Sequence, residues 1–135
     1  MGAIFGGGGR VTKCYFNGTL RNSGSVASGY ITPQIGGIGS PMSSGNSSIT
    51  YSFFAGSMSS SVSGIYQGAI NGDNRGSSSN CYYASSSSFN RSGGTSTSTS
   101  NLQSSSWLSS TLGWDFTNVW TFTADSDYPV LKAFI

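Results

Sequence analysis

Charged side chains are scarce in this chain of 135 residues, and two residue types that commonly carry chemistry are missing altogether. Lysine, arginine, aspartate and glutamate make up 7% of the sequence, against roughly 25% in an average globular protein. Histidine and glutamate are absent, so all four acidic residues are aspartates. General acid–base catalysis and most zinc sites depend on histidine and glutamate. We therefore expect no enzyme, no bound metal and no cofactor.

The basic residues are equally sparse: six are scattered along the chain, and the net charge is +2. No two of them are adjacent, and no aromatic residues alternate with them in a basic stripe. Nucleic-acid binding requires clustered lysine and arginine, so no nucleic-acid partner is expected. No apolar run approaches the roughly 18 residues of a membrane-spanning helix, and the first residues lack the pattern of a secretory signal peptide.

Small polar residues and glycine dominate what is present, with 31 serines, 20 glycines, 11 threonines and 9 asparagines. Such a composition can indicate disorder, but 36% of the residues are hydrophobic and 13% are aromatic. The aromatic residues form short clusters flanked by turn-forming residues. Because glycine and serine recur every few positions, long helices are excluded from most of the chain. We expect a folded all-β protein.

Two kinds of short string recur along the chain. Glycine-rich strings at residues 2–6, 36–40 and 68–72 align at offsets of 34 and 32 residues, and aromatic strings follow at residues 11–20, 49–58 and 78–85. Short strands that repeat at a fixed spacing are typical of a β-solenoid, in which equivalent strands stack about 4.8 Å apart. We expect a parallel β-solenoid of about three to four rungs over residues 1–84, in repeats of about 2–35, 36–67 and 68–84.

The alignment of these repeats predicts which side chains stack into ladders. The expected core positions are Ile4, Ile38 and Ile70 in the glycine-rich strings and Tyr15, Phe53 and Tyr82 in the aromatic strings. Phe16, Phe54 and Tyr83 directly follow the aromatic set and form a second ladder. Neighbouring strand residues point to opposite faces, so one ladder should be interior and the other exposed or covered by a loop.

The two cysteines, Cys14 and Cys81, fall at the same repeat position as Ser52. They are then two rungs apart, about 9.6 Å, which exceeds the roughly 7 Å limit for a disulfide. We favour two reduced, buried side chains in one ladder over a disulfide, which is the usual interpretation of two cysteines in a secreted chain. A metal site is favoured still less, because the sequence lacks the further ligands that such a site needs.

Residues 85–99 are predicted to form a Ser/Thr-rich loop, and residues 100–135 a short helix and a C-terminal cap. Leu102, Leu108 and Leu112 suit an amphipathic helix, for which Thr99 or Ser100 would be the N-cap. A solenoid end exposes strand edges and an open core, so it needs a cover. The expected cap residues are Trp107, Trp114, Phe116 and Trp120. A sugar-stacking platform is the alternative role for these tryptophans.

The string Gly36-Gly-Ile-Gly39, a turn, and then an Ile/Val-x-x-Cys-Tyr-x-x-Gly strand together resemble the GLUG repeat of bacterial surface proteins. The resemblance covers most of the chain. Its more specific part is the region of residues 113–120 and 128–131, which is similar to the terminator of a GLUG array. GLUG repeats occur in large adhesins and in some phage-encoded proteins. The resemblance implies a right-handed parallel β-helix with a surface role, and no catalytic residue.

We expect a non-enzymatic adhesion or structural module that is extracellular, on a cell surface or on a virion. It would present polar loops, such as residues 41–48 and 85–98, to a cell surface or a glycan. The alternative is an architectural subunit. Nothing in the sequence precedes residues 2–6 that would cover the first rung, so this rung would pair with a second copy, a preceding solenoid or another subunit.

Two further functions are weighed and favoured less. A β-helix enzyme that degrades glycans needs paired acids, whereas Asp73 is the only acidic residue within the repeats. An ice-binding protein needs threonines on successive rungs. Thr95, Thr97 and Thr99 form one Thr-x-Thr string, but the other repeats carry no threonines at matching positions.

Overall fold

A computed structural model describes residues 2–4, 9–24, 34–39, 47–72, 76–84, 89, 91 and 93–135. In these residues the chain is mostly β, with two short helices near the C-terminus. The strands of the repeats are β1 (Arg10–Thr12), β2 (Tyr15–Phe16), β3 (Thr19–Asn22), β4 (Gln34–Gly36), β5 (Ser48–Thr50), β6 (Phe53–Phe54), β7 (Ser57–Ser60), β8 (Tyr66–Gly68), β9 (Ser77–Ser79), β10 (Tyr82–Ala84) and β11 (Thr95–Thr97). The C-terminal segment contains α1 (Thr99–Leu102), α2 (Ser105–Leu112), β12 (Trp120–Thr121), β13 (Val130–Leu131) and the 3₁₀ helix η1 (Lys132–Phe134).

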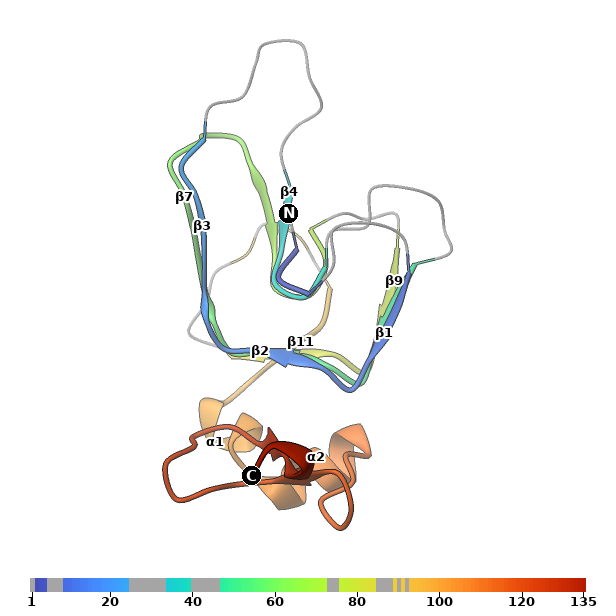
Figure 1. Cartoon of the computed structure of the whole chain (residues 1–135). Coiled ribbons are helices and arrows are strands. Elements are labelled where there is room, and N and C mark those ends of the chain that lie inside the picture. The colour runs from blue at the N-terminus through green and yellow to red at the C-terminus, as the bar shows by residue number, and fades with distance from the viewer. Residues whose placement is uncertain are drawn as a thin grey trace.

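The strands of the repeats pair in parallel, as expected for an all-β fold built from repeats. Four sheets result, with the strand orders β1-β5-β9, β11-β10-β6-β2, β3-β7 and β4-β8. In Figure 1 the first three sheets form three sides of an open cross-section, and β4 lies between the two outer sides. Each side is a stack of equivalent strands from successive repeats.

The registers confirm the predicted ladders. Tyr15, Phe53 and Tyr82 pair in one row of Cα partners, and the residues that follow them pair in the next row. The ring centroids of Tyr15 and Phe53 are 4.9 Å apart, and the two rings are stacked. The glycine-rich strings also pair as aligned, because Gly36 bridges Gly2 on one side and pairs with Gly68 on the other.

The interior ladder is the one that contains Phe54. This residue is 1% exposed and packs with Ile38, Ile49 and Ile70. Ile4, another expected core residue, is not buried, because its side chain is 41% exposed. Its backbone N–H still donates to the Ile38 carbonyl at 2.9 Å. Ile4 lies in the first rung, and in the described residues it has a stacked neighbour on one side only. The expectation of a buried Ile4 is therefore wrong.

The ladder of Tyr15, Phe53 and Tyr82, expected in the core of the solenoid, lies instead on the outer face of the β2-β6-β10-β11 sheet, and the C-terminal segment covers it. Leu102, Leu108 and Leu112 pack there together with Phe53 and Trp114. The expectation that this segment covers the end of the stack is wrong. In Figure 1 it lies along the flank, against the side of the sheet that contains β2 and β11. The physical reason is that the large aromatic side chains of this ladder are removed from water when the segment packs on them.

Two details of this segment also differ from the prediction. The helical region is divided into α1 and α2, and the N-caps are Ser98 and Ser104, whose hydroxyls accept from the N–H groups of Asn101 and Trp107. The predicted loop over residues 85–99 contains β11, which pairs in parallel with β10. Serines occupy many positions here, and they do not mark which of them begins a helix.

One corner of the repeat holds three non-glycine residues in the left-handed region. Lys13, Tyr51 and Asn80 have φ angles of 53°, 51° and 50°. Left-handed backbone costs an ordinary L-residue roughly 1–2 kcal/mol, and asparagine tolerates it best. Of the three residues, only Asn80 is well suited to this conformation.

We therefore predict that Tyr51→Asn stabilises the protein by about 0.5 kcal/mol. The Tyr51 side chain is 40% exposed and belongs to neither apolar cluster of the described residues, so the relief of strain is expected to exceed the packing that is lost. The reverse change at the equivalent corner, Asn80→Tyr, should lower the free energy of unfolding. Urea unfolding measures both variants, and an equal destabilisation by both would contradict the strain argument.

Candidate functional site

The expected cap residues and the outer ladder form one continuous cluster, which we call the aromatic seam: Tyr15, Phe53, Tyr82, Trp107, Trp114, Phe116 and Trp120. Trp114 is at its centre, 1% exposed, with ring centroids 5.4 Å from Phe53 and 4.4 Å from Trp120. Its indole Nε1–H donates to the Tyr51 carbonyl at 2.9 Å. A buried indole presents no face to a sugar, so Trp114 packs in the layer that covers the outer ladder and does not form a sugar-stacking platform.

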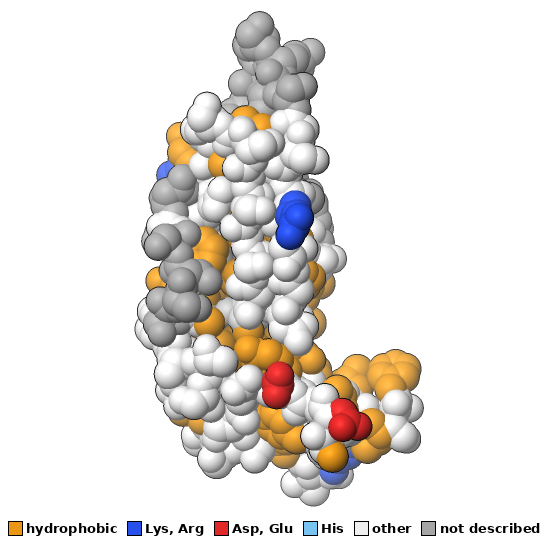
Figure 2. Space-filling model, turned by 90° about the vertical axis from the view of Figure 1, so that its left-hand side faces the viewer, with side chains coloured by type: hydrophobic (Ala, Val, Ile, Leu, Met, Phe, Trp, Pro, Cys, Tyr) orange, Lys and Arg blue, Asp and Glu red, His pale blue; other side chains and the backbone are white. Residues whose placement is uncertain are grey.

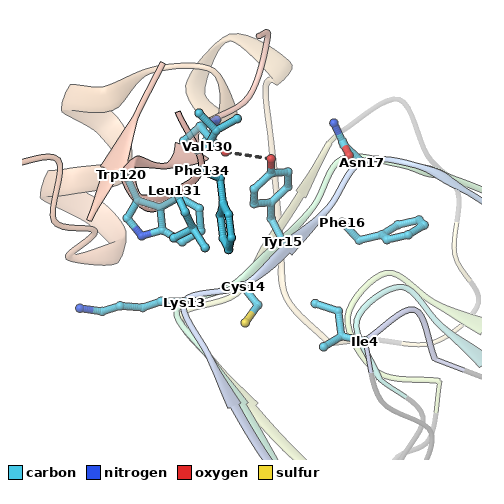
Figure 3. Close-up of a pocket in the computed structure, with 11 residues that line it drawn as sticks. Ile4, Lys13, Cys14, Tyr15, Phe16, Asn17, Trp120, Val130, Leu131 and Phe134 are labelled. Atoms are coloured by element: carbon cyan, nitrogen blue, oxygen red, sulfur yellow. Dashed lines mark hydrogen bonds between the residues drawn. The ribbon is translucent and has the colours of Figure 1, made fainter. Parts of the chain in front are cut away.

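An open hollow with a volume of about 520 Å³ adjoins the seam at Tyr15. Its lining is largely apolar and comes from the first rung and the C-terminal segment: Ile4, Lys13, Cys14, Tyr15, Phe16, Asn17, Trp120, Pro129, Val130, Leu131 and Phe134. Figure 3 shows Tyr15 facing Trp120, Leu131 and Phe134, while Phe16 and Ile4 lie on the other side of β2. Phe134 is 82% exposed.

Two hydrogen bonds hold the walls of the hollow together. The Tyr15 hydroxyl donates to the Pro129 carbonyl at 2.8 Å, which fixes the C-terminal segment against β2. The Lys13 ammonium donates to the Gly113 carbonyl at 2.8 Å, at the left-handed residue that ends α2. Figure 3 shows this side chain directed away from Ile4 and Phe16. Lys13 is the one charged residue among the described lining residues, and it is thus already bonded to the C-terminal segment.

The hollow lies beside an open strand edge. In the part of the chain that the structure describes, β1, β2 and β3 are each the last strand of their sheet on this side. The carbonyls of Cys14, Phe16 and Gly18 accept from the N–H groups of the neighbouring repeat. Alternate residues of a parallel strand direct their backbone groups to opposite sides. Tyr15 and Asn17 therefore direct theirs to the open side.

Both cysteines are free thiols, as the rung spacing predicts. Burial raises the pKa of each thiol. The Cys81 Sγ–H donates to the Ile49 and Ser79 carbonyls at 3.3 Å, and the Cys14 Sγ–H donates to the Thr12 carbonyl at 3.3 Å. Cys14 is only half-buried, which differs from the expectation. A protonated thiol is a poor nucleophile and a poor metal ligand.

The outer faces of the side sheets carry hydroxyl groups in register. The Thr50 hydroxyl donates to that of Thr12 at 3.1 Å, and Thr19 and Ser57 share a hydrogen bond of 3.0 Å. Figure 2 shows the flank that contains β3 and β7 as mainly uncharged polar surface. Of the predicted contact loops, residues 41–46 of the first and residues 85–88, 90 and 92 of the second lie outside the described residues, and so does Asp73.

The remaining acidic residues belong to the C-terminal segment. The Asp115 carboxylate accepts from the Asn118 side chain and from the N–H groups of Asn118 and Thr117, and these bonds lower its pKa. It therefore acts as the cap of a turn. In the described residues, no three Cys or Asp side chains gather where a metal ion would be held, and no helix is long and apolar enough to cross a membrane.

Comparison of the chain with protein-family models, with curated protein sequences and with solved structures gave no match. The hollow itself was missed by the sequence interpretation. Phe134 is the last aromatic residue of the chain and follows β13 closely, but no pattern in the sequence indicates that it lies beside the first repeat.

Proposed function

We propose that this chain is a right-handed parallel β-solenoid of about three to four rungs that serves as a non-enzymatic adhesion and structural module. It belongs outside the cell or on a virion, in keeping with the GLUG resemblance of its repeats. The observation that carries the proposal is the hydroxyl register on the side sheets, where Thr12 and Thr50 hydrogen-bond across repeats. Hydroxyl groups held in register on one face suit hydrogen bonding to a glycan.

The test is retention of the protein on a panel of immobilised neutral polysaccharides at low and high salt. Few charges are available, so retention should be insensitive to salt. The double variant Thr12→Val, Thr50→Val keeps the branched side-chain shape and removes the hydroxyls, and it should weaken retention about ten-fold. Thr121→Val in β12 is the matched control. Loss of binding in high salt, or equal binding by both variants, would contradict this function.

A second function is favoured by a separate observation, the open edge of β1, β2 and β3 beside the hollow. In this function the chain is an architectural subunit that joins a neighbour end to end, since an exposed strand edge is a template for pairing. Light scattering across a concentration series identifies the neighbour. A measured mass that rises above 14.0 kDa with concentration indicates that the neighbour is another copy of this chain. A chain that stays at this mass and takes up no added strand would contradict the function.

A further inference from the structure

We propose that the open edge of β1 and β2, with the hollow beside it, binds an extended segment of a different polypeptide as an additional parallel strand. The inference rests on the second function above and specifies the chemistry of the partner. The segment carries two consecutive large apolar residues, at the positions facing Tyr15 and Phe16. It also carries an acidic residue at the position facing Arg10 and a glycine or asparagine at the position facing Lys13.

The backbone of the edge determines the type of partner. Tyr15 and Asn17 direct their backbone groups to the open side, as described above, and Tyr15 pairs with Phe53 in parallel on the other side. An incoming parallel strand continues the same ladder. It must also turn the corner at Lys13, where the equivalent residues Tyr51 and Asn80 have positive φ. Glycine or asparagine turns this corner at the lowest cost.

The apolar surface beside Tyr15 is the reason that the partner segment should carry two large residues. Within the protein, each aromatic of the outer ladder packs between the sheet and the C-terminal segment, as Phe53 does against Trp114. Beyond Tyr15 the sheet has no further strand in the described residues. Only the side of this interface that the C-terminal segment forms continues there, through Trp120, Leu131 and the exposed Phe134. Figure 3 shows these side chains next to Tyr15, and all of them line the hollow. A large side chain stacked on Tyr15 would occupy this hollow.

The charges along the edge indicate that the partner segment carries an acidic residue. They also argue against a second copy of this chain as the partner. Arg10 and Arg21 are exposed on the edge strands β1 and β3, and the described strands of the repeats contain no acidic residue. Two copies joined through this edge would bring these arginines together without a counter-charge, which is unfavourable. The opposite end of the stack offers β11, whose Thr95 and Ser96 would place hydroxyls in an apolar hollow.

The third repeat of the chain supplies a probe with nearly the required pattern. In residues 76–84, Asn80 occupies the corner, and Tyr82 and Tyr83 are the two large residues. A fluorescently labelled peptide of this sequence should bind the intact protein, as measured by anisotropy. The Ser77→Asp peptide should bind about two- to five-fold more tightly. Arg10→Ala in the protein should remove that gain and leave the binding of the parent peptide unchanged.

Two protein variants and one peptide variant complete the test. Phe134→Ser should weaken peptide binding about ten-fold without affecting the fold, because Phe134 is 82% exposed. Val119→Ser is the matched control, since Val119 is exposed on the same segment but does not line the hollow. The peptide with Tyr82→Ser and Tyr83→Ser should not bind.

Four outcomes separate the inference from the function on which it rests. Equal binding by the parent and the serine-substituted peptides, or equal binding by the Phe134→Ser and Val119→Ser proteins, would overturn the proposed chemistry. Concentration-dependent growth in mass without peptide binding would assign the edge to a second copy; the inference would then fail while the architectural function stands. A constant 14.0 kDa without peptide binding would overturn both.

Discussion

Replacing Gly36 by alanine is expected to cost more than about 4 kcal/mol and to leave little folded protein, since the whole stability of a small domain is about 5–15 kcal/mol. A Cβ at Gly36 would collide with the Gly39 carbonyl oxygen and would lie 2.7 Å from the Gly72 nitrogen of the next repeat. Both obstacles are backbone atoms within the stack, so neither moves aside without breaking hydrogen bonds. Circular dichroism and urea unfolding measure the loss.

Gly24→Ala is the matched control for this prediction. Among the described residues, a Cβ at Gly24 meets only the Asn22 side-chain oxygen, at 3.5 Å. The expected change in the free energy of unfolding is within about 0.5 kcal/mol. If Gly36→Ala unfolded at the same urea concentration as Gly24→Ala, the tight approach of the glycine-rich strings would be wrong.

Trp114→Ala is expected to destabilise the protein by about 3–5 kcal/mol, the range for a large aromatic removed from a core. Trp114 is 1% exposed and contacts the rings of Phe53 and Trp120. It also joins the C-terminal segment to the corner at Tyr51 through its indole hydrogen bond. The loss should therefore appear as a single, earlier transition of the whole chain, followed by both tryptophan fluorescence and circular dichroism.

The variant Trp114→Phe separates the contribution of ring packing to stability from that of the indole hydrogen bond. Trp114→Phe keeps an aromatic ring in the seam and leaves the Tyr51 carbonyl without its donor, so a loss of about 1–3 kcal/mol is expected. Two separate transitions in the alanine variant, with the β signal unchanged, would show instead that the C-terminal segment does not support the sheets.

Much of the stacking was predictable from the sequence because repeated strings leave few alternatives. The offsets between the glycine-rich strings are the same ones at which Gly2, Gly36 and Gly68 pair. Glycine recurs there for a local reason, since a Cβ at Gly68 would collide with the Asn71 carbonyl just as one at Gly36 would collide with that of Gly39. The aromatic side chains set the register of the sheet that contains β2, β6 and β10 in the same way.

The candidate site was less predictable, because its residues come from opposite ends of the chain. Tyr15 and Phe134 line one hollow, although they are separated by nearly the whole sequence. The N-caps show a related difficulty at short range. Ser98 and Ser104 cap the helices, but the neighbouring serines and threonines have the same chemistry.

By itself, the sequence determined the parallel, mostly β architecture and the register of its ladders, because side-chain repetition specifies which residues stack. The tertiary structure alone decided which ladder faces inward. Phe53 and Phe54 are adjacent, equally large and almost fully buried, so nothing local distinguishes them. Their roles are set by what covers each face: Ile38, Ile49 and Ile70 of the interior on one side, and the C-terminal segment on the other. Burial of apolar area is non-directional, and it therefore depends on which surfaces the folded chain brings together.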